Sequence, residues 1–419
     1  MPGHVTHREA RVWLQLTHSV EVRLRYKREP ENALDDTLPW HYTRTALPTR
    51  DSAYCHTAVL DSLEPGYTYL YQLVVDDQPL EKVYRLRTPA LWQWRSDPPN
   101  LRIALGSCTF VNDPLYDRPG RPFGGNYEIF GSIARQQPDM MLWLGDNVYF
   151  RESDWGSRAG MLYRHSHTRS LPELQPLLSA CPHYAIWDDH DFGPNNSDGT
   201  FALKHEALRA FRLFWANPPT PPDLEPGITT TFELGDAQFF LLDGRYHRAP
   251  NRRRTGERTL LGKKQLEWLI GALRSSEATF KFVAIGGQVL SPLKRWETYA
   301  HYFPEERQQL LDALRAEKIG GVIFLTGDRH QTELCRLDST GFAPLLDFTV
   351  SPLTAGAVPD SLLEPNPLRL PGTLVRERNF ALLELRGPRT DRELVFSVLN
   401  AQGTFLWQRT LRARELYAD

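Results

Sequence analysis

Cysteine is scarce in this chain, with four residues among 419 and no CxxC pair. That number and spacing exclude a disulfide-stabilised scaffold. No apolar run approaches the ~20 residues that a membrane-spanning helix needs. An excess of one charge is also lacking, because the formal net charge is −2. Nothing therefore indicates nucleic acid or an anionic membrane surface as a partner.

The amino-terminal residues lack the features of an export signal. They contain no basic stretch followed by an apolar one, and no twin arginine. The sequence as written therefore predicts a cytoplasmic protein. Its length exceeds the size at which one hydrophobic core usually stops growing, so we expect more than one domain.

Residues 1–89 show the alternation of apolar and polar side chains that is typical of β-strands. The segment 63–69 (LEPGYTY) resembles the tyrosine-corner stretch of fibronectin type III and immunoglobulin-like domains. We expect an amino-terminal β-sandwich over 1–89 that serves as a packing or positioning module, since it offers no catalytic cluster. Residues 90–100, which end in two prolines and an asparagine, are predicted to be a linker.

From residue 101 to 419 the pattern changes to short, uniformly apolar runs with helical stretches between them. Uniformly apolar runs are typical of strands buried on both faces, and alternation with helices indicates an α/β core. The number of strands exceeds that of one doubly wound sheet, so we expect two mixed sheets sandwiched between helices. The helical stretches are 126–137, 171–180, 201–215, 262–276 and 304–319.

Five of the apolar runs are followed directly by side chains suited to chemistry. Ligands of open α/β sheets bind beyond the carboxyl ends of the strands, so these side chains are expected to meet. They are Cys108; Asp146 and Tyr149; Asp188, Asp189, His190 and Asp191; Gln288; and Asp328, Arg329 and His330.

Carboxylates, an imidazole, an amide and a thiolate are metal ligands, and carboxylates can bridge two cations. Without cations, so many negative charges in one cleft would be costly. A thiolate favours iron or zinc, whereas oxygen ligands also suit calcium, manganese or magnesium. Two close metals support in-line attack of a metal-activated hydroxide on phosphorus. His190 is then the candidate proton donor or phosphate contact, and Asp188 and Asp191 would orient it or ligate an outer cation. Arg245 and Arg329 are the candidate phosphate clamps.

These motifs resemble the alkaline phosphatase D (PhoD-like) family of calcineurin-like metallophosphoesterases. The similarity rests on GSC (106–108), GDNVY (145–149), WDDHDFGPNNSD (187–198), LDGRYHR (242–248), GGQVLSP (286–292) and GDRHQTE (327–333). It implies the metallophosphatase αββα fold and hydrolysis of a small phosphate ester. Family relatives are often exported, so the resemblance leaves a periplasmic or secreted location open.

The resemblance also implies a ligand set. Thiolate and phenolate ligation of Fe3+ would fall to Cys108 and Tyr149, with Ca2+ beside the iron and Zn2+, Mn2+ or Mg2+ as alternatives. The remaining metal candidates are Asp146, Asp189, Asn195, Gln288, Asp328 and His330. The chain departs from the family at Asn196, where relatives usually have Asp, and at Gln331, where they often have His. These departures put an outer metal site in doubt.

Several alternatives stay open from the sequence. Asn195 and Gln288 could simply satisfy backbone groups near turns. His165 and His167 are interpreted as a basic surface or the rim of a pocket. The main hypothesis is a phosphomonoesterase, and additional diesterase activity stays open. The rivals are a phosphodiesterase or phospholipase-like enzyme, and a non-catalytic protein that keeps its metals for structure. The sequence leaves the oligomeric state undetermined.

Overall fold

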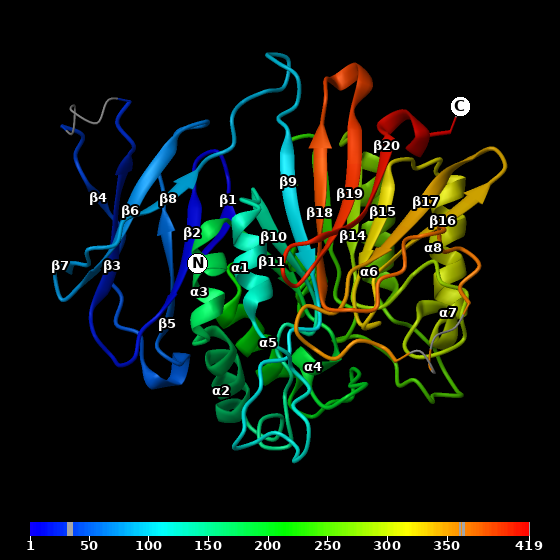
Figure 1. Cartoon of the computed structure of the whole chain (residues 1–419), viewed down its shortest axis with the longest axis horizontal. Coiled ribbons are helices and arrows are strands. Elements are labelled where there is room, and N and C mark those ends of the chain that lie inside the picture. The colour runs from blue at the N-terminus through cyan, green and yellow to red at the C-terminus, as the bar shows by residue number, and fades with distance from the viewer. Residues whose placement is uncertain (32–36, 360–361, 363–364, 419) are drawn as a thin grey trace.

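Two six-stranded sheets lie at the centre of the chain from residue 101 onward (Figure 1). The computed structural model describes residues 1–31, 37–359, 362 and 365–418. In the first sheet the strand order is β11-β10-β9-β18-β19-β20, with β9, β10 and β11 parallel and the others antiparallel. Its strands are β9 (Leu101–Gly106), β10 (Met140–Leu144), β11 (His183–Ile186), β18 (Asn379–Arg386), β19 (Glu393–Asn400) and β20 (Phe405–Arg412).

The second sheet has the order β12-β13-β14-β15-β17-β16, and its four inner strands are parallel. An antiparallel hairpin that turns at Gly235 joins β12 to β13, and a second antiparallel pair, β16 and β17, closes the other edge. The strands are β12 (Thr230–Leu234), β13 (Ala237–Leu241), β14 (Phe280–Ala284), β15 (Val322–Thr326), β16 (Glu333–Ser339) and β17 (Phe342–Thr349).

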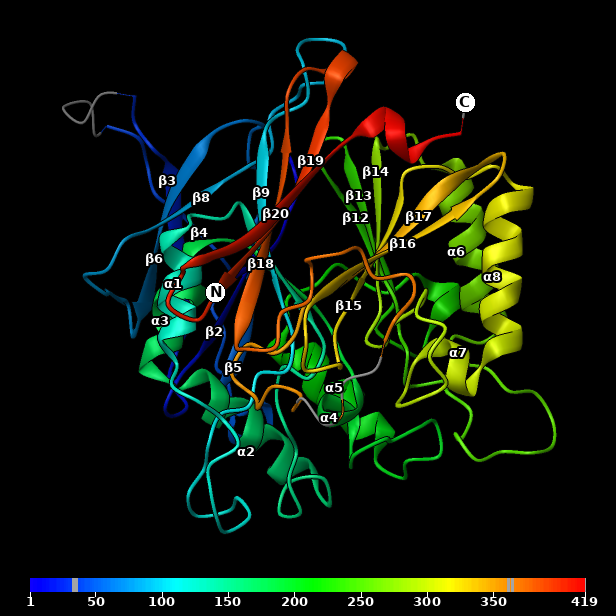
Figure 2. The same cartoon turned by 45° about the vertical axis from the view of Figure 1, so that its right-hand side comes forward.

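The two sheets pack face to face, and helices cover their outer faces (Figure 2). Phe348 of β17 meets Phe396 of β19 edge to face, with ring centroids 5.1 Å apart. Every residue of β10, β14 and β15 is buried because both faces of each strand are covered. The helices α1 and α3 flank the first sheet, and α6 and α8 flank the second. The prediction of a mixed α/β core is confirmed.

The described helices begin and end as follows: α1 (Glu128–Arg135), α2 (Arg158–Arg169), α3 (Gln175–Ala180), α4 (Asp189–Phe192), α5 (Lys204–Phe214), α6 (Lys263–Ser275), α7 (Tyr299–Tyr302) and α8 (Pro304–Ala316). Short 3-10 helices are η1 (Arg50–Ser52), η2 (Pro172–Leu174), η3 (Pro222–Leu224), η5 (Arg389–Asp391) and η6 (Ala413–Leu416). Each of the five predicted helical stretches contains a helix. None of the described helices is both long and apolar enough to cross a membrane.

Helix α2 was not predicted, and it changes the interpretation of its two histidines. His165 is fully buried, and its ring stacks on Phe214 with centroids 4.7 Å apart. The interpretation of His165 as part of a basic surface or rim is therefore wrong. His167 is half-buried, and its Nε2 contacts the carbonyl of Asn112 at 3.0 Å.

The amino-terminal residues form two antiparallel sheets that share one core. The first contains β1 (Pro2–Val5), β2 (Ala10–Gln15) and β5 (Cys55–Leu60); the second contains β3 (Val22–Arg28), β4 (His41–Tyr42), β6 (Thr68–Val75), β7 (Gln78–Pro79) and β8 (Tyr84–Arg87). The N–H of Glu64 donates to the hydroxyl of Tyr69 at 2.8 Å, within the stretch that resembles a tyrosine corner. Trp13 ties this region to the second half of the chain by donating to the carbonyl of Leu213 at 3.0 Å.

Candidate metal centre

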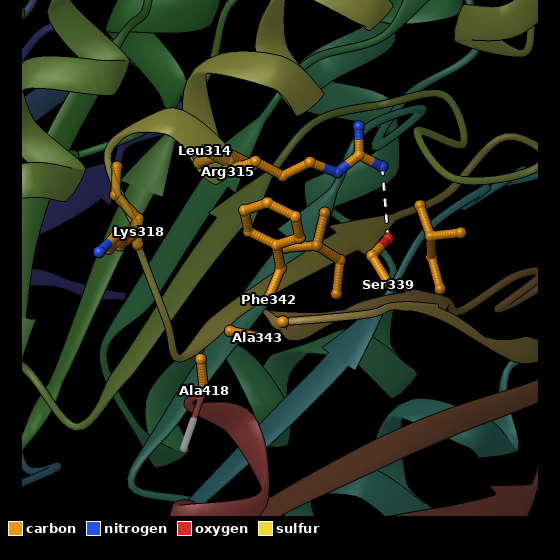
Figure 3. A pocket seen from close by; sticks show the side chains of 11 residues that line it. Leu314, Arg315, Lys318, Ser339, Phe342, Ala343 and Ala418 are labelled. Atoms are coloured by element: carbon orange, nitrogen blue, oxygen red, sulfur yellow. Dashed lines mark hydrogen bonds between the residues drawn. The ribbon is translucent and has the colours of Figure 1, made fainter.

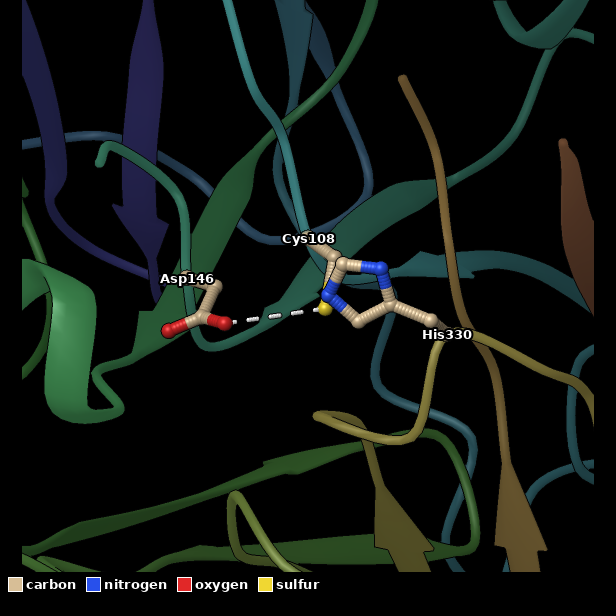
Figure 4. Close-up of side chains that lie close together, drawn as sticks. All are labelled: Cys108, Asp146 and His330. Atoms are coloured by element: carbon tan, nitrogen blue, oxygen red, sulfur yellow. Dashed lines mark hydrogen bonds between the residues drawn. The ribbon is translucent and has the colours of Figure 1, made fainter. Parts of the chain in front are cut away.

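Side chains that follow β9, β10 and β15 meet at one point, although they are up to 222 residues apart in the chain. Ligand atoms of Cys108, Asp146 and His330 all lie within 4.8 Å of one another (Figure 4). The Sγ of Cys108 is 3.7 Å from Oδ2 of Asp146. The hydroxyl of Tyr149 is 3.1 Å from the same oxygen and 3.3 Å from Nε2 of His330. One thiolate, one carboxylate, one imidazole and one phenol can thus converge on a single ion.

Two further sets of ligand atoms overlap with the first. Asp146 also groups with Asp189 and His190, and Asp189 groups with Asp188 and Asp328, each set again within 4.8 Å. Asp146 and Asp189 therefore belong to two sets each. A carboxylate shared between two sets of ligands is the arrangement by which two cations are bridged.

The backbone at the strand ends is strained. The φ angles are 58° at Cys108, 51° at Asp146, 64° at Asp328 and 52° at His330, all in the left-handed region. Residues other than glycine rarely adopt this backbone conformation, which costs about 1–3 kcal/mol per residue. Residues with a strained backbone cluster at active sites and ligand-binding sites. The strain here aims four candidate ligands into one place.

Two glycines allow Asp188 to approach the centre closely. A Cβ atom on Gly286 would overlap the Asp188 carboxyl group. Gly145, with φ of +92°, passes so close that its Cβ would lie 2.8 Å from the Cβ of Asp188. Any larger residue at Gly286 would push this carboxylate out of position.

Arg245 is buried within a network of carboxylates, being only 1% exposed. Its Nε donates to Oδ1 of Asp188 at 2.6 Å, and its Nη2 pairs with Oε2 of Glu297 at 2.6 Å. Its Nη1 donates to the carbonyl of Ser197 at 3.1 Å, so all three nitrogens of the guanidinium have partners within the protein. A direct contact of Arg245 with phosphate stays a prediction. The contacts within the protein make Arg245 a support for Asp188 instead.

The remaining predicted residues are less closely tied to the centre. Arg329 lies over the ring of Trp296 at 5.5 Å, next to Asp328 in the chain. Gln288 is buried and donates to Glu333 at 2.6 Å and to Thr349. Asn195 is exposed. For Gln288 and Asn195, metal ligation stays a prediction without a described contact to the other ligands.

Asp191 has a structural role that the sequence analysis left open. Its Oδ1 accepts hydrogen bonds from the N–H groups of Asn147 and Val148, at 2.9 and 3.3 Å. Its Oδ2 accepts from the N–H of Asp188 at 3.0 Å. Asp191 thereby joins the loop after β10 to the loop after β11 and fixes where Asp146 and Asp188 lie.

The residues fit multivalent cations. Burial raises the pKa of Asp146, and the negative charges of Asp189 and Cys108 raise it further. Burial also raises the pKa of the Cys108 thiol to about 12. The Oδ2 of Asp188 and the Nδ1 of His190 are buried without a hydrogen-bond partner among the described residues. Buried polar atoms are rarely left unpaired, and positive charge would relieve both conditions.

We expect metal affinity to rise with pH. In the metal-free protein burial raises the pKa of the Cys108 thiol to about 12, so the thiol holds its proton near neutrality and a cation must displace it. Affinity should therefore rise about tenfold per pH unit for each displaced proton, between about pH 6 and about pH 8. Competition titrations with a coloured chelator measure this slope. A flat profile would show that the ligands are already ionised.

Ser351 is a positioning residue that the sequence analysis missed. Its hydroxyl donates to Sγ of Cys108 at 3.1 Å and accepts from the N–H of His330 at 3.0 Å. It follows β17, which pairs with β15, so it too lies at the carboxyl end of a parallel strand. Applying the strand-end rule to the run LLDFTV would have found it.

One hollow adjoins the candidate centre and another does not. The adjoining hollow, of about 890 Å³, is lined by Phe123, Gly356 and Arg378 among others. The ring of Phe123 lies 5.7 Å from that of His330, whose Nδ1 is hydrogen-bonded to the carbonyl of Gly356. The second hollow, of about 130 Å³, lies between α8 and the β16–β17 hairpin and contains none of the candidate ligands (Figure 3).

A model of the PhoD-like phosphatase family matches residues 105–387. The chain belongs to this family. It is 25% identical over 323 residues to alkaline phosphatase D of Bacillus subtilis (strain 168), an alignment that covers 64% of this chain and 52% of the relative. The chain thus spans about half the length of the curated relative that it matches.

Two solved structures share the fold of this PhoD-like chain. A structure of PhoD superposes with a TM-score of 0.76 at 19% identity, covering 98% of this chain and 91% of the other. Purple acid phosphatase PPD1 from yellow lupin (Lupinus luteus) seeds superposes with a TM-score of 0.72 at 13% identity, covering 99% and 75%. At these identities the likeness shows the fold alone.

Proposed function

We propose that the protein is a metal-dependent hydrolase of phosphate esters that acts on monoesters, and a parallel assay described below measures its activity on diesters. The observation that carries this proposal is the sharing of Asp146 and Asp189 between overlapping sets of ligand atoms. A pair of bridged cations activates water and neutralises charge on the phosphoryl oxygens. Membership of the PhoD-like phosphatase family supports the same chemistry.

The donor atoms differ across the centre, which suggests two kinds of cation. Cys108, Tyr149 and His330 offer sulfur, phenol oxygen and imidazole nitrogen, a set that suits Fe3+ or Zn2+. Asp188, Asp189 and Asp328 offer oxygen alone, which suits Ca2+, Mn2+ or Mg2+. We propose Fe3+ in the first position and Ca2+ in the second. A visible charge-transfer band from thiolate or tyrosinate would identify the iron.

His190 is assigned to the phosphoryl group. Its ring stacks on that of Tyr149 with centroids 4.3 Å apart. Burial lowers the pKa of His190, so the imidazole is neutral near pH 7. A neutral imidazole still donates one N–H, and we therefore propose that His190 holds a phosphoryl or leaving oxygen rather than carrying a full positive charge.

The hollow beside Phe123 and the amino-terminal sheets would support the reaction from outside the centre. The hollow of about 890 Å³ beside Phe123 would receive the part of the substrate beyond the phosphorus. We propose the domain boundaries 1–89, 90–100 and 101–419, with a fibronectin III- or immunoglobulin-like sandwich, a linker and the PhoD-like domain. The shared core of the two amino-terminal sheets supports the sandwich.

Parallel assays on one reconstituted sample test the proposal. Protein supplied with Fe3+ and Ca2+ should hydrolyse an aryl phosphate monoester. A strong chelator should abolish the activity, because it removes the cations that would activate water and neutralise the phosphoryl oxygens. The matching aryl diester, assayed alongside, measures diesterase activity. Stoichiometric metal with no turnover of either ester would favour a non-catalytic metalloprotein instead.

A further inference from the structure

Arg151 is a nearly buried cation that no motif singled out. It follows Tyr149 and Phe150 in the loop after β10, and its side chain is only 11% exposed. Phe150 fixes this segment by donating its N–H to the carbonyl of His190 at 3.1 Å. The guanidinium lies 5.6 Å from the ring centre of Phe110, which itself packs against Tyr149.

The guanidinium of Arg151 donates no hydrogen bond within the part of the chain that the structure describes, and its Nε is buried. A guanidinium carries five N–H donors, and buried donors are almost always paired. Its nearest carboxylates are Asp117 at 3.8 Å and Glu152 at 4.0 Å from Nε, both too far for a hydrogen bond. Glu152 is already paired with Arg118 at 2.6 Å. The two carboxylates attract Arg151 but leave its donors available.

The position of these donors is close to the candidate centre. The ring of Phe110, over which the guanidinium lies, packs against the ring of Tyr149 with centroids 5.1 Å apart. Tyr149 in turn stacks on His190, the residue assigned to the phosphoryl group, with centroids 4.3 Å apart. Arg245, in contrast, is held by Asp188 and Glu297. Arg151 thus has what Arg245 lacks, namely a cationic fork near the stacked rings of Tyr149 and His190 with its donors unused. That fork matches the geometry of two phosphoryl oxygens.

We propose that Arg151 binds the phosphoryl oxygens of the substrate and thereby favours the dianion of a phosphate monoester over the monoanion of a diester. The inference rests on the proposed function, and it narrows the substrate class. A second non-bridging negative charge, which only the monoester carries, gains most from an additional cation in a poorly solvated site.

The test compares Arg151→Ala, Arg151→Lys and a control, Arg85→Ala. Arg85 lies in β8, is 73% exposed and pairs with Glu29, so its loss should leave kinetics unchanged. Arg151→Ala should lower kcat/KM for an aryl monoester by roughly ten- to a hundredfold and that for the diester by much less. The inhibition constant of orthophosphate should rise by a similar factor. Arg151→Lys should recover part of the loss, because it keeps the charge without the fork.

An unchanged monoester-to-diester ratio with unchanged phosphate inhibition in Arg151→Ala would overturn the inference. If the alanine variant binds less metal, Arg151→Lys with full metal content decides: it must bind orthophosphate more weakly in a calorimetric titration, and unaltered binding overturns the inference. A wild-type protein that binds orthophosphate but hydrolyses neither ester would overturn the proposed function instead. The two failures are therefore distinguishable.

Discussion

The variant Asp146→Asn should lose ester hydrolysis by about a thousandfold or more and should bind less metal. Asp146 belongs to two of the three sets of ligand atoms, one with Cys108 and His330 and one with Asp189 and His190. An amide keeps the shape of the side chain but removes the negative charge that would bridge two cations. If the transition state loses several kcal/mol of charge stabilisation, the rate of hydrolysis falls by about this factor.

The measurement is kcat/KM for an aryl phosphate together with elemental analysis of the same sample. Asp223→Asn is the matched control, since Asp223 is exposed in η3 and belongs to none of the three sets. It should retain full activity and metal. Because burial and neighbouring charges raise the pKa of Asp146, the metal-free Asp146→Asn protein should be no less stable than the metal-free wild type. Full activity in Asp146→Asn would show that Asp146 does not bridge two cations.

The variant Arg245→Met should lower the free energy of unfolding by about 3–5 kcal/mol. Arg245 is buried between Asp188 and Glu297. Its removal leaves Asp188 without its ion-pair partner and leaves Glu297 paired with Arg248 alone. The same change should misplace Asp188 and reduce metal binding and activity. Denaturant unfolding of metal-loaded protein measures the first effect, and elemental analysis measures the second.

Arg392→Met provides the control for this prediction. Arg392 is also buried and pairs with Asp236 at 2.8 Å, but it belongs to a different network. Its loss should likewise destabilise the protein by several kcal/mol, while the folded protein keeps its metal and its kcat. If Arg245→Met instead unfolds like the wild type and only KM for phosphate esters rises, Arg245 contacts the substrate and the supporting role is wrong.

Sequence reasoning located the centre because strand ends follow a general rule. Cys108 and Asp146 follow parallel neighbours in the first sheet, and His330 follows β15, a parallel strand of the second sheet. The carboxyl ends of these strands come together where the two sheets pack face to face. The identity of the strands and the type of side chain were therefore enough to predict that these residues converge. The same reasoning reached the mixed α/β architecture.

Other features could not be read from the sequence because they depend on long-range geometry. The pairing of Arg245 with Glu297 joins residues 52 positions apart, and no local pattern predicts it. The left-handed backbone of Cys108 and Asp146 opposes local preference, so only the folded surroundings explain it. Helix α2 was missed because its segment has few apolar residues, with Met161 and Leu162 the main ones.

The most direct test of the central claim is an anomalous-scattering map from crystals of the metal-loaded protein. The account predicts two peaks about 3.5–4 Å apart, with the Asp146 carboxylate between them and Cys108 next to one peak only. A map without metal at this edge of the sheets, or a single ion that Asp146 does not touch, would contradict it.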